Sequence, residues 1–365
     1  MIGILTFHHV YNYGAVMQTY ALQEYLKEKG GRVAVLDIRP FTRYPTEIAH
    51  RGRISRKALH ILNQAGLLKA GEKQRLFDSF RKEHLHLTRR IYNLNRYLNS
   101  ASDLTSIVVG SDQVWAPRFG KKAMETYLLM SVPDSINKVA YAACSYGVGR
   151  GSAEFERYED GLSRFSGISV RDGFTRDKVA GVSDTAVEVV VDPSLLNELS
   201  FGISKSDLGV PEDYILYYGF SENGDRVSRS LSEEYGLPVV SIAMEDNHRE
   251  SSAEVNLSSV GPKEWISAIQ QARFVVTKSF HGTMFSLRSG VPVLVVPGDE
   301  KAVPRLEDAC NRFGLKGALI YPADCERDPV SRLKGVDWAS VRQLMERHVR
   351  DSKYFLDKYV LQREG

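Results

Sequence analysis

Cysteine is scarce in this chain: its 365 residues include only Cys144, Cys310 and Cys325, which lie far apart. No CxxC pair occurs, which argues against a zinc or dithiol redox motif, and an odd number of dispersed thiols fits a reducing compartment. The apolar start, residues 1–7, lacks the basic region and the small-residue cleavage site of a signal peptide. We therefore expect a cytoplasmic protein whose cysteines are ordinary thiols.

Long apolar runs and an excess of one charge are missing as well. No stretch of about 18 apolar residues occurs, so no membrane-spanning helix is expected. The 48 Lys and Arg residues nearly balance 45 Asp and Glu, and the net charge of +3 is too small for a dedicated nucleic-acid-binding protein. Anionic small molecules or an anionic membrane surface remain the candidate partners.

Two ligand motifs are absent near the N-terminus. No G-x-G-x-x-G joins the first predicted strand to the first predicted helix, which argues against a nicotinamide or flavin dinucleotide. His8 and His9 are adjacent, and neighbouring side chains point apart on a strand, so a metal site there is disfavoured. We therefore expect neither an organic cofactor nor a bound metal.

What the chain does contain is an alternation of short apolar runs and helical stretches. Runs rich in Val and Ile predict buried strands at residues 2–7, 32–37, 106–110, 138–143, 166–170 and 187–191. Between them lie helical stretches such as residues 15–29, whose apolar side chains share roughly one face. This alternation is typical of a doubly wound parallel sheet with crossover helices.

The alternation starts again after Asp192 and Pro193. Strands are predicted at 214–219, 238–243, 274–277 and 292–296, with helices near 222–235, 262–271, 282–289 and 302–313. A chain of this length is expected to form roughly two domains. We therefore predict an α/β fold with two Rossmann-like domains facing across a cleft: residues 1–195, then a linker and residues 212–336. The final segment, 337–365, is predicted as an amphipathic helix. Packing of this helix against the N-terminal domain is one arrangement left open.

Residues 41–99 fit this scheme least well and are predicted as a helical insertion. Arg51, Arg53, Arg56 and Lys57 form a basic cluster within it. One interpretation is a solvated helical surface. The other is peripheral contact with an anionic acceptor or the inner face of a membrane, where each Lys or Arg contributes ~1 kcal/mol.

The first polar motif joins the first predicted strand to the first helix. Asn12 is suited to cap that helix, and Gly14 permits close approach of the backbone to a ligand. The N–H groups of the helix start are available to an anion. The alternative is a loop with capping chemistry only.

The second motif follows the strand predicted at 106–110. Ser111, Asp112 and Gln113 place small polar groups beside the indole of Trp115. An aromatic face next to a carboxylate and an amide suits a sugar ring. The alternative is a tight polar turn with Trp115 in the core.

The third motif lies where a predicted strand runs into a helix that begins near Gly282. Lys278, Ser279 and His281 gather there, which is a place to hold phosphate or to carry out acid–base chemistry. Arg171 ends another strand and offers a bidentate fork to a carboxylate or phosphate. The alternative for Arg171 is a structural pair with the adjacent Asp172.

Five blocks of residues together resemble the polysaccharide pyruvyl transferases. In chain order they are Asn12-Tyr13-Gly14-Ala15-Val16, Val109-Gly110-Ser111-Asp112-Gln113-Val114-Trp115, Ser169-Val170-Arg171-Asp172, Val191-Asp192-Pro193 and Ser279-Phe280-His281-Gly282. The resemblance spans about residues 1–315. It implies a GT-B-like pair of Rossmann domains, phosphoenolpyruvate as donor, and a pair of sugar hydroxyls as acceptor. The implied product is a pyruvate ketal on a cell-surface glycan or its lipid-linked precursor.

The resemblance also assigns roles. Arg171 and His281 match family positions associated with donor binding or catalysis. Many relatives carry Arg two residues before that His, where this chain has Ser279 preceded by Lys278. We expect the donor to contact Arg171 of the N-terminal domain together with Lys278, Ser279 and Gly282 of the C-terminal domain, the predicted donor side. His281, or an acid that it orients, is expected to protonate the enol. The predicted acceptor side comprises Asp112, which would position or deprotonate a hydroxyl, with Asn12, Gly14, Ser111, Gln113 and Trp115.

Two other functions stay open at this point. One is a nucleotide-sugar glycosyltransferase on the same scaffold, since a fold does not fix a function. Such an enzyme needs an acidic residue placed to hold a ribose, and neither Glu300 nor Glu307 has a persuasive context for that role. The other is a non-catalytic two-lobed protein that binds sugar or phosphate.

Overall fold

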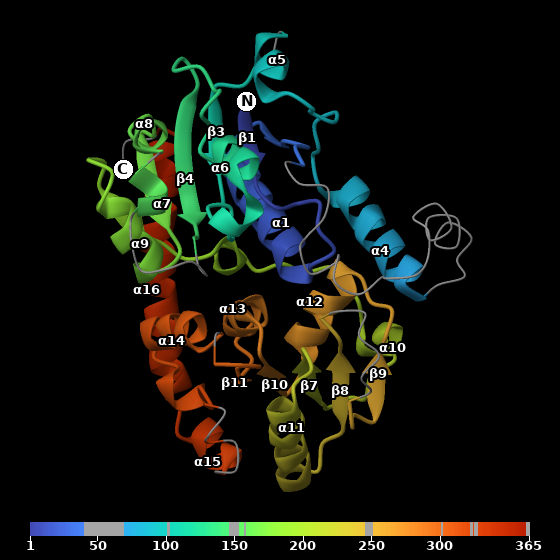
Figure 1. Ribbon diagram of the computed structural model, residues 1–365. Helices are drawn as coiled ribbons and strands as arrows, with labels where there is room; N and C mark the ends of the chain where they lie inside the picture. Colours follow the sequence, from blue (N-terminus) through green and yellow to red (C-terminus); the bar gives the residue numbers. More distant parts are fainter. Residues whose placement is uncertain are drawn as a thin grey trace.

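Two parallel β-sheets lie one above the other in the computed structural model of the chain (Figure 1). The structure describes residues 1–39, 69–100, 103–145, 153–156, 158–244, 251–300, 302–321, 324 and 328–362. The predicted basic cluster of Arg51, Arg53, Arg56 and Lys57 lies outside these residues, as does Cys325.

The first sheet has the strand order β2-β1-β3-β4-β5-β6, and every neighbouring pair is parallel. Its strands are β1 (Ile2–Leu5), β2 (Val33–Val35), β3 (Ser106–Val109), β4 (Asn137–Ala143), β5 (Gly167–Val170) and β6 (Val187–Val189). The strands β1 to β5 are buried along almost their whole length, as expected for a parallel sheet covered on both faces. The structure thus confirms the strands predicted from the Val-rich and Ile-rich runs.

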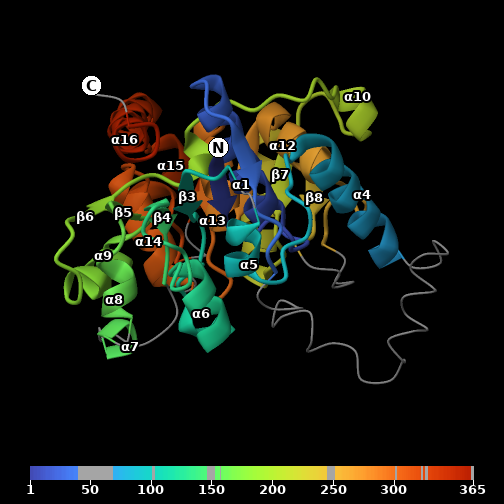
Figure 2. The same ribbon diagram turned by 90° about the horizontal axis from the view of Figure 1, so that it is seen from above.

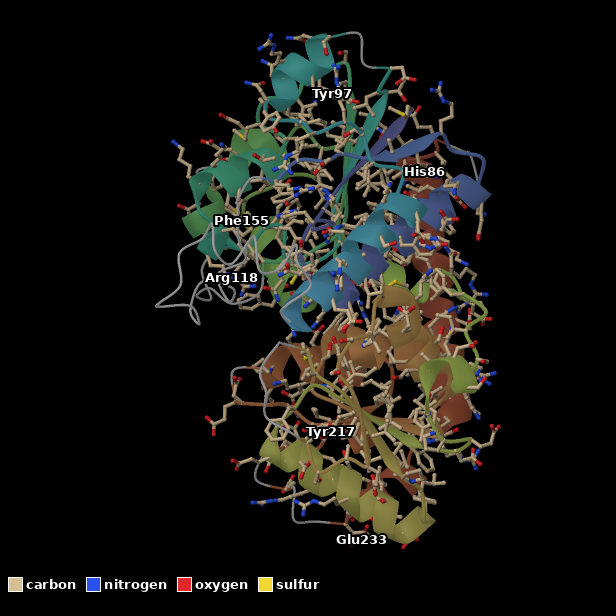
Figure 3. All side chains as sticks on the ribbon, turned by 90° about the vertical axis from the view of Figure 1, so that its right-hand side faces the viewer. His86, Tyr97, Arg118, Phe155, Tyr217 and Glu233 are labelled. Atoms are coloured by element: carbon tan, nitrogen blue, oxygen red, sulfur yellow. The ribbon has the colours of Figure 1, made fainter. Side chains whose placement is uncertain are left out.

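The second sheet has the order β11-β10-β7-β8-β9 and is also parallel. Its strands are β7 (Ile215–Tyr218), β8 (Val239–Ile242), β9 (Val255–Leu257), β10 (Phe274–Thr277) and β11 (Val293–Val295). The sequence prediction missed β9, because this edge strand is short and its central Asn256 is exposed. Figure 3 shows Tyr217 of β7 inside this half of the molecule and Glu233 at its outer surface.

Helices connect the strands in both halves. In the first half they are α1 (Tyr13–Glu28), α4 (Lys69–His84), α5 (Leu94–Asn99), α6 (Lys121–Tyr127), α7 (Ala153–Glu156), α8 (Glu159–Leu162) and α9 (Gly173–Ala180). In the second they are α10 (Lys205–Leu208), α11 (Glu222–Tyr235), α12 (Pro262–Gln271), α13 (Phe280–Arg288), α14 (Val303–Arg312), α15 (Pro329–Lys334) and α16 (Trp338–Tyr359). Three short 3-10 helices, Pro117–Phe119, Pro193–Leu195 and Lys316–Ala318, complete the described elements.

Two helices that point at the space between the sheets begin two residues earlier than predicted. The side chain of Asn12 accepts a hydrogen bond from the N–H of Ala15 at 3.0 Å, so α1 starts at Tyr13. The hydroxyl of Ser279 accepts one from the N–H of Gly282 at 3.2 Å, so α13 starts at Phe280. The structure confirms the predicted cap at Asn12 and assigns a second cap to Ser279.

Aromatic packing joins the two halves through α1, α4 and α12. Tyr13 stacks on Trp265 with ring centroids 5.4 Å apart and an interplanar angle of 13°, and its hydroxyl donates to the carbonyl oxygen of Val260 at 3.0 Å. Phe77 of α4 packs on Tyr13, and both Phe77 and Phe80 are buried. The described part of the predicted insertion is therefore not a solvated helix, because α4 packs into the joint between the halves.

The C-terminal helix α16 spans both halves on the side of the molecule opposite α4 (Figures 1 and 2). Near its start it pairs with the second half, where Glu346 accepts a hydrogen bond from Arg288 at 2.7 Å. Further along, Ser352 accepts a hydrogen bond from the N–H of Val191 at 2.9 Å, and the carbonyl oxygen of Tyr359 accepts one from Asn137. The helix thus contacts the first sheet as well as the second half, and α4 and α16 together fix how the two sheets face each other.

Candidate active site

A cavity of about 560 Å³ lies between the carboxyl ends of the two sheets. The arrows of β4 and β8 point toward this region from above and below (Figure 1). In each sheet the strand order reverses direction next to the first strand of that sheet, at β1/β3 and at β7/β10. Ligands of doubly wound proteins bind at such reversal points. The topology alone therefore places a binding site here.

Loops that leave the strand ends supply the lining of the cavity. Asn12, Asp112 and Gln113 contribute from the first half. The second half contributes the starts of α11, α13 and α14, including Lys278, Ser279, His281 and Arg305. The structure thus brings together residues from the three motifs that the sequence analysis singled out.

His281 lies in the first turn of α13, is 9% exposed, and lines the cavity. The ring packs directly on Gly14 of α1: a Cβ on that glycine would lie 2.3 Å from the Nδ1 and Cγ atoms of His281. The other ring nitrogen, Nε2, lies 3.5 Å from the Oδ2 atom of Asp192. The prediction that Gly14 approaches a ligand is therefore corrected, because the space over its α-carbon is filled by the imidazole.

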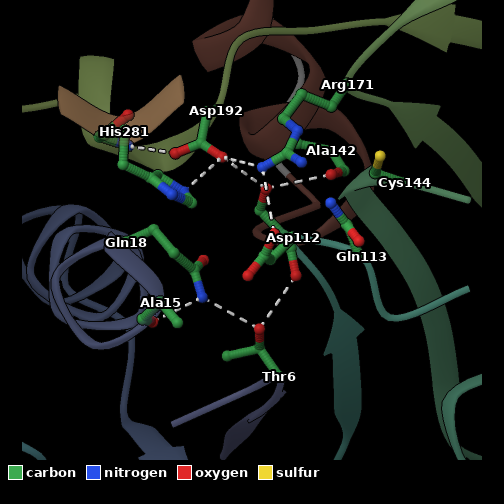
Figure 4. Close-up of polar contacts among 12 residues, drawn as sticks. Thr6, Ala15, Gln18, Asp112, Gln113, Ala142, Cys144, Arg171, Asp192 and His281 are labelled. Carbon is green, nitrogen blue, oxygen red and sulfur yellow. Dashed lines mark hydrogen bonds and ion pairs between the residues drawn. The ribbon is translucent and has the colours of Figure 1, made fainter. Parts of the chain in front are cut away.

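Asp192 follows β6 and is the centre of a buried polar network (Figure 4). Its Oδ2 atom accepts hydrogen bonds from Ser111 Oγ at 2.9 Å and from Arg171 Nη1 at 3.0 Å, and Oδ1 accepts one from the N–H of Ser194 at 3.0 Å. Burial raises the pKa of Asp192, but the charges and hydrogen bonds of His281, Arg171 and the Ser194 N–H outweigh it. The net pKa lies well below the usual range, so Asp192 is ionised at neutral pH.

Arg171 does not line the main cavity. Its side chain is 2% exposed, and its guanidinium lies beneath the ring of Phe280, with Cζ 4.3 Å from the ring centroid. Burial lowers its pKa, but nearby acidic groups, including Cys144, Asp112 and Asp192, outweigh burial and raise it overall. The charge of Arg171 balances buried carboxylates, and its predicted contact with the donor stays a prediction.

Asp172 does not form the ion pair with Arg171 that the sequence left open. Its side chain caps α9, accepting a hydrogen bond from the N–H of Thr175 at 2.7 Å. The same carboxylate accepts a hydrogen bond from the thiol of Cys144 at 3.0 Å. Asp172 thus serves as the N-cap of α9.

Asp112 and Gln113 reach the cavity because the chain turns sharply after β3. Asp112 has a positive φ of 68°, and its Oδ1 atom lies 3.4 Å from Arg171 Nη1. Gln113 accepts a hydrogen bond from Arg118. Ser111 points the other way: its hydroxyl is fully buried and contacts Asp192 and the carbonyl oxygen of Ala142. The predicted acceptor role of Ser111 is therefore corrected to support of the buried network.

Two cations and two carboxylates line the second half of the cavity: Lys278, Arg305, Glu222 and Asp299. Lys278 Nζ donates a hydrogen bond to the carbonyl oxygen of Phe220 at 2.8 Å and stays partly exposed. Arg305 of α14 also lines the cavity. The sequence analysis missed Arg305, because it lies inside a helix and only the fold brings it to the strand ends.

Gly282 and Trp115 have structural roles. The N–H of Gly282 is taken by Ser279, and a Cβ at this glycine would lie 2.8 Å from Thr277 Oγ1, so the residue allows α13 to pack on β10. Trp115 is fully buried, and its indole N–H donates to the carbonyl oxygen of Tyr127 at 3.1 Å. The predicted contacts with the donor and with a sugar ring are therefore corrected for Gly282 and Trp115.

Among the described residues, no three His, Cys, Asp or Glu side chains are grouped so as to hold a metal ion. In the same part of the chain, no helix is long and apolar enough to cross a membrane.

The family model for polysaccharide pyruvyl transferase matches residues 12–300, which is most of the chain. The chain belongs to this family. The match covers every strand except β1 and most of the cavity lining, including Asp112 and His281, and it also includes Asp192. No curated protein is significantly similar to this family member in sequence.

Solved structures similar to this pyruvyl transferase family member share its two-sheet architecture. UGT89C1 of Arabidopsis thaliana in complex with UDP-L-rhamnose matches with a TM-score of 0.55 and 12% identity, covering 99% of this chain and 98% of that one. A putative UDP-N-acetylglucosamine 2-epimerase from Listeria monocytogenes matches with a TM-score of 0.52 and 9% identity, covering 99% and 96%. Identities this low establish the fold, which is the predicted GT-B-like pair of α/β domains.

Proposed function

We propose that the protein transfers the pyruvyl group of phosphoenolpyruvate to two hydroxyls of a sugar, forming a cyclic ketal. The sugar belongs to a cell-surface polysaccharide or its lipid-linked precursor. The observation that carries the proposal is His281 on the wall of a cavity that also contains Lys278 and Arg305, in a member of the polysaccharide pyruvyl transferase family. We place the reaction in the cytoplasm, with the protein free or held at the inner face of the membrane.

The second half of the cavity is suited to the donor because two cations, Lys278 and Arg305, line it beside the carboxylates of Glu222 and Asp299. Phosphoenolpyruvate carries a phosphate and a carboxylate. Lys278 and Arg305 offer positive charge to these groups, and the first turn of α13 offers N–H groups at the positive end of the helix dipole. Lys278 precedes Ser279, the position at which many relatives carry Arg, and as a point charge it fits either anionic group.

His281 is the proposed acid of the first step. Its imidazolium proton goes to the methylene carbon of the enol, which becomes a methyl group, and the adjacent carbon becomes electrophilic. One sugar hydroxyl forms a C–O bond to that carbon and loses its proton. The second hydroxyl then forms the other C–O bond as the C–O bond to phosphate breaks. One hydroxyl proton restores His281, and the other leaves with the phosphate.

The first half of the cavity is the proposed acceptor side. Asp112 offers a carboxylate to a sugar hydroxyl, and Asn12 and Gln113 offer amide groups that donate and accept hydrogen bonds. Asp112 also lies 3.4 Å from Arg171, which holds the carboxylate in place beside the cavity.

The test is phosphate release from phosphoenolpyruvate across a panel of free sugars and lipid-linked glycans. We expect release with at least one acceptor, together with a product heavier by pyruvate less one water in mass spectrometry. Replacing His281 by Ala should lower turnover by ~100-fold or more, the usual scale for an acid–base group. The matched control is His86→Ala, since His86 is exposed and outside the cavity.

Thermal-shift titration separates this function from the two alternatives. A ligand that binds only the native state raises the melting temperature. Phosphoenolpyruvate should stabilise the wild type and the Lys316→Met control, which changes an exposed lysine, and should stabilise Lys278→Met less. Stabilisation by UDP- or GDP-sugars alone would favour a glycosyltransferase. Binding of phosphoenolpyruvate without phosphate release on any acceptor would favour a non-catalytic binder.

A further inference from the structure

We propose that Asp192 is a positioning residue for His281. Its carboxylate holds the Nε2 side of the imidazole and so fixes the orientation of the ring that lines the cavity. This inference rests on the proposed function for its kinetic consequences, but its geometric content can be tested without turnover.

Three elements fix the position of the Asp192 carboxylate. The side chain is fully buried and does not line the main cavity. Ser111 after β3 and Arg171 after β5 hold Oδ2 at 2.9 and 3.0 Å, and the N–H of Ser194 holds Oδ1 at 3.0 Å. None of these partners belongs to α13. The carboxylate of Asp192 is therefore held rigidly by the first half of the molecule and contacts His281 of the second half.

His281 is held between that carboxylate and α1. Oδ2 of Asp192 faces Nε2 at 3.5 Å, which is an ion-pair distance and longer than an ordinary hydrogen bond. Catalytic hydrogen bonds are often long without substrate and shorten when it binds. On the Nδ1 side, the ring rests on the α-carbon of Gly14, where a methyl group would not fit. These two contacts leave the ring little freedom to rotate.

Charged side chains from both halves of the molecule surround His281. Lys278, two residues before α13, and Arg305 on α14 line the cavity, and Arg171 lies below Phe280. The carboxylates of Glu222 and Asp299 line the same cavity. Asp112 is the only carboxylate of the first half that lines the cavity in the described residues, and Asp192 is the carboxylate within ion-pair distance of His281. Asp192 is thus placed to orient the imidazole from the first half of the molecule.

The first experiment is a pH–rate profile of Asp192→Asn, which keeps the size and one oxygen of the side chain. We expect kcat to fall by ~10- to 100-fold with little change in the KM for phosphoenolpyruvate, because Asp192 does not touch the cavity. The high-pH limb of the profile should move to lower pH, because protonated His281 loses its counterion. The control, Asp337→Asn, changes an exposed helix cap far from the cavity.

A double-mutant cycle shows whether Asp192 acts through His281. In the His281→Ala background, Asp192→Asn should add less than ~3-fold to the loss, because residues that act as a unit are not additive. If Asp192→Asn lowered kcat as much in the His281→Ala background as in the wild type, the proposal would be overturned. An unchanged pH profile of the Asp192→Asn single variant would also overturn it. A raised KM with normal kcat would also overturn it, since that result would mean direct donor binding.

Imidazole signals keep the test independent of turnover. In ¹⁵N-histidine-labelled protein, with His281→Ala for assignment, we expect the wild type to carry the Nε2 proton of His281 and Asp192→Asn to show a different tautomer population. Identical His281 signals in the two proteins would overturn the positioning role. Absence of phosphate release by the wild type would instead count against the proposed function and leave this measurement valid.

Discussion

Gly14 and His281 meet across the two halves of the molecule, the α-carbon of one against the imidazole ring of the other. Gly14 lies in the first turn of α1, which follows β1 of the first sheet, and His281 lies in the first turn of α13, which follows β10 of the second. The contact shows why both belong to one site although 266 residues lie between them. The absence of a side chain at Gly14 sets the position of the ring that faces the cavity.

Replacing Gly14 by Ala should therefore displace the ring of His281. The added Cβ would lie 2.3 Å from ring atoms, so either the imidazole or α1 must move. We expect turnover to fall by ~100-fold, the scale of a misplacement of about 1 Å, and stability to fall by about 1–3 kcal/mol. Phosphate release and thermal unfolding measure the two effects.

The matched control for this change is Gly317→Ala. The nearest atom to a Cβ at Gly317 is 3.4 Å away in Val336, an ordinary contact, and Gly317 lies outside the cavity. The control should keep normal turnover. Normal turnover in Gly14→Ala would show that the contact with His281 has no part in the reaction.

The second prediction concerns Arg171 as a counterion. Arg171→Met leaves the buried carboxylates of Asp192 and Asp112 without their shared cation. Removing one partner of a buried ion pair costs about 3–5 kcal/mol, because the remaining charge is not compensated. Urea unfolding should show this loss. Arg176→Met, which breaks an exposed pair with Asp177, should cost no more than about 1 kcal/mol.

A second variant distinguishes a structural counterion from a direct donor ligand. Adding Asp192→Leu to Arg171→Met removes the uncompensated charge and should recover part of the lost stability. Recovery is not expected if Arg171 acts by binding the donor alone. Full stability of Arg171→Met in urea would contradict the counterion role.

The parallel sheets could be predicted from the sequence because their strands are buried on both faces and read as continuous apolar runs. β10 (Phe274–Thr277) was predicted with its observed bounds. β9 has only two apolar residues, both half-buried, and the exposed Asn256 separates them, so no apolar run marks this strand. The predicted starts of α1 and α13 are two residues too late, because each helix begins directly after its cap, Asn12 or Ser279.

The candidate site could be predicted only where its residues follow strand ends. Lys278, His281 and Asp112 do so, and the topology brings such ends together. Arg305 lies within α14 and reaches the cavity through tertiary packing alone. The one available signal for Asp192 was its place after an apolar run, which gives no indication of its partners.

The direction in which side chains point after a turn is the main feature that the sequence did not predict. Nothing in the sequence from Gly110 to Trp115 tells which side chains point to the cavity and which to the core. The structure has Asp112 at a positive φ, which turns Asp112 and Gln113 outward and leaves Trp115 inside.

The third prediction tests that corrected position of Trp115. Trp115→Ala removes a fully buried indole and its hydrogen bond to Tyr127, and should cost about 3–5 kcal/mol in stability. The KM for the acceptor should stay normal in the folded variant. Gln113→Ala, which changes a residue of the cavity, should raise that KM with little effect on thermal unfolding. A raised acceptor KM in Trp115→Phe with normal stability would restore the sugar-stacking role.

The last prediction uses His9, which packs near the carboxyl ends of β1 and β2. Burial, and then the positive groups His8, Arg39 and Arg81, lower its pKa from 6.5 to about 3. His9 is therefore neutral in the folded protein through most of the acid range. The unfolded chain takes up a proton below about pH 6.5, and the folded chain does so only near pH 3.

Stability should therefore fall as the pH drops from about 6.5 toward 3, since the unfolded state binds more protons in that window. His9→Asn removes this group, so its melting temperature should fall less than that of the wild type between pH 7 and pH 4.5. His86→Asn changes an exposed histidine whose side chain lies outside the buried cluster, and should follow the wild type. Equal slopes for His9→Asn and the wild type would show that His9 is protonated in the folded protein, against its burial beside three cationic side chains.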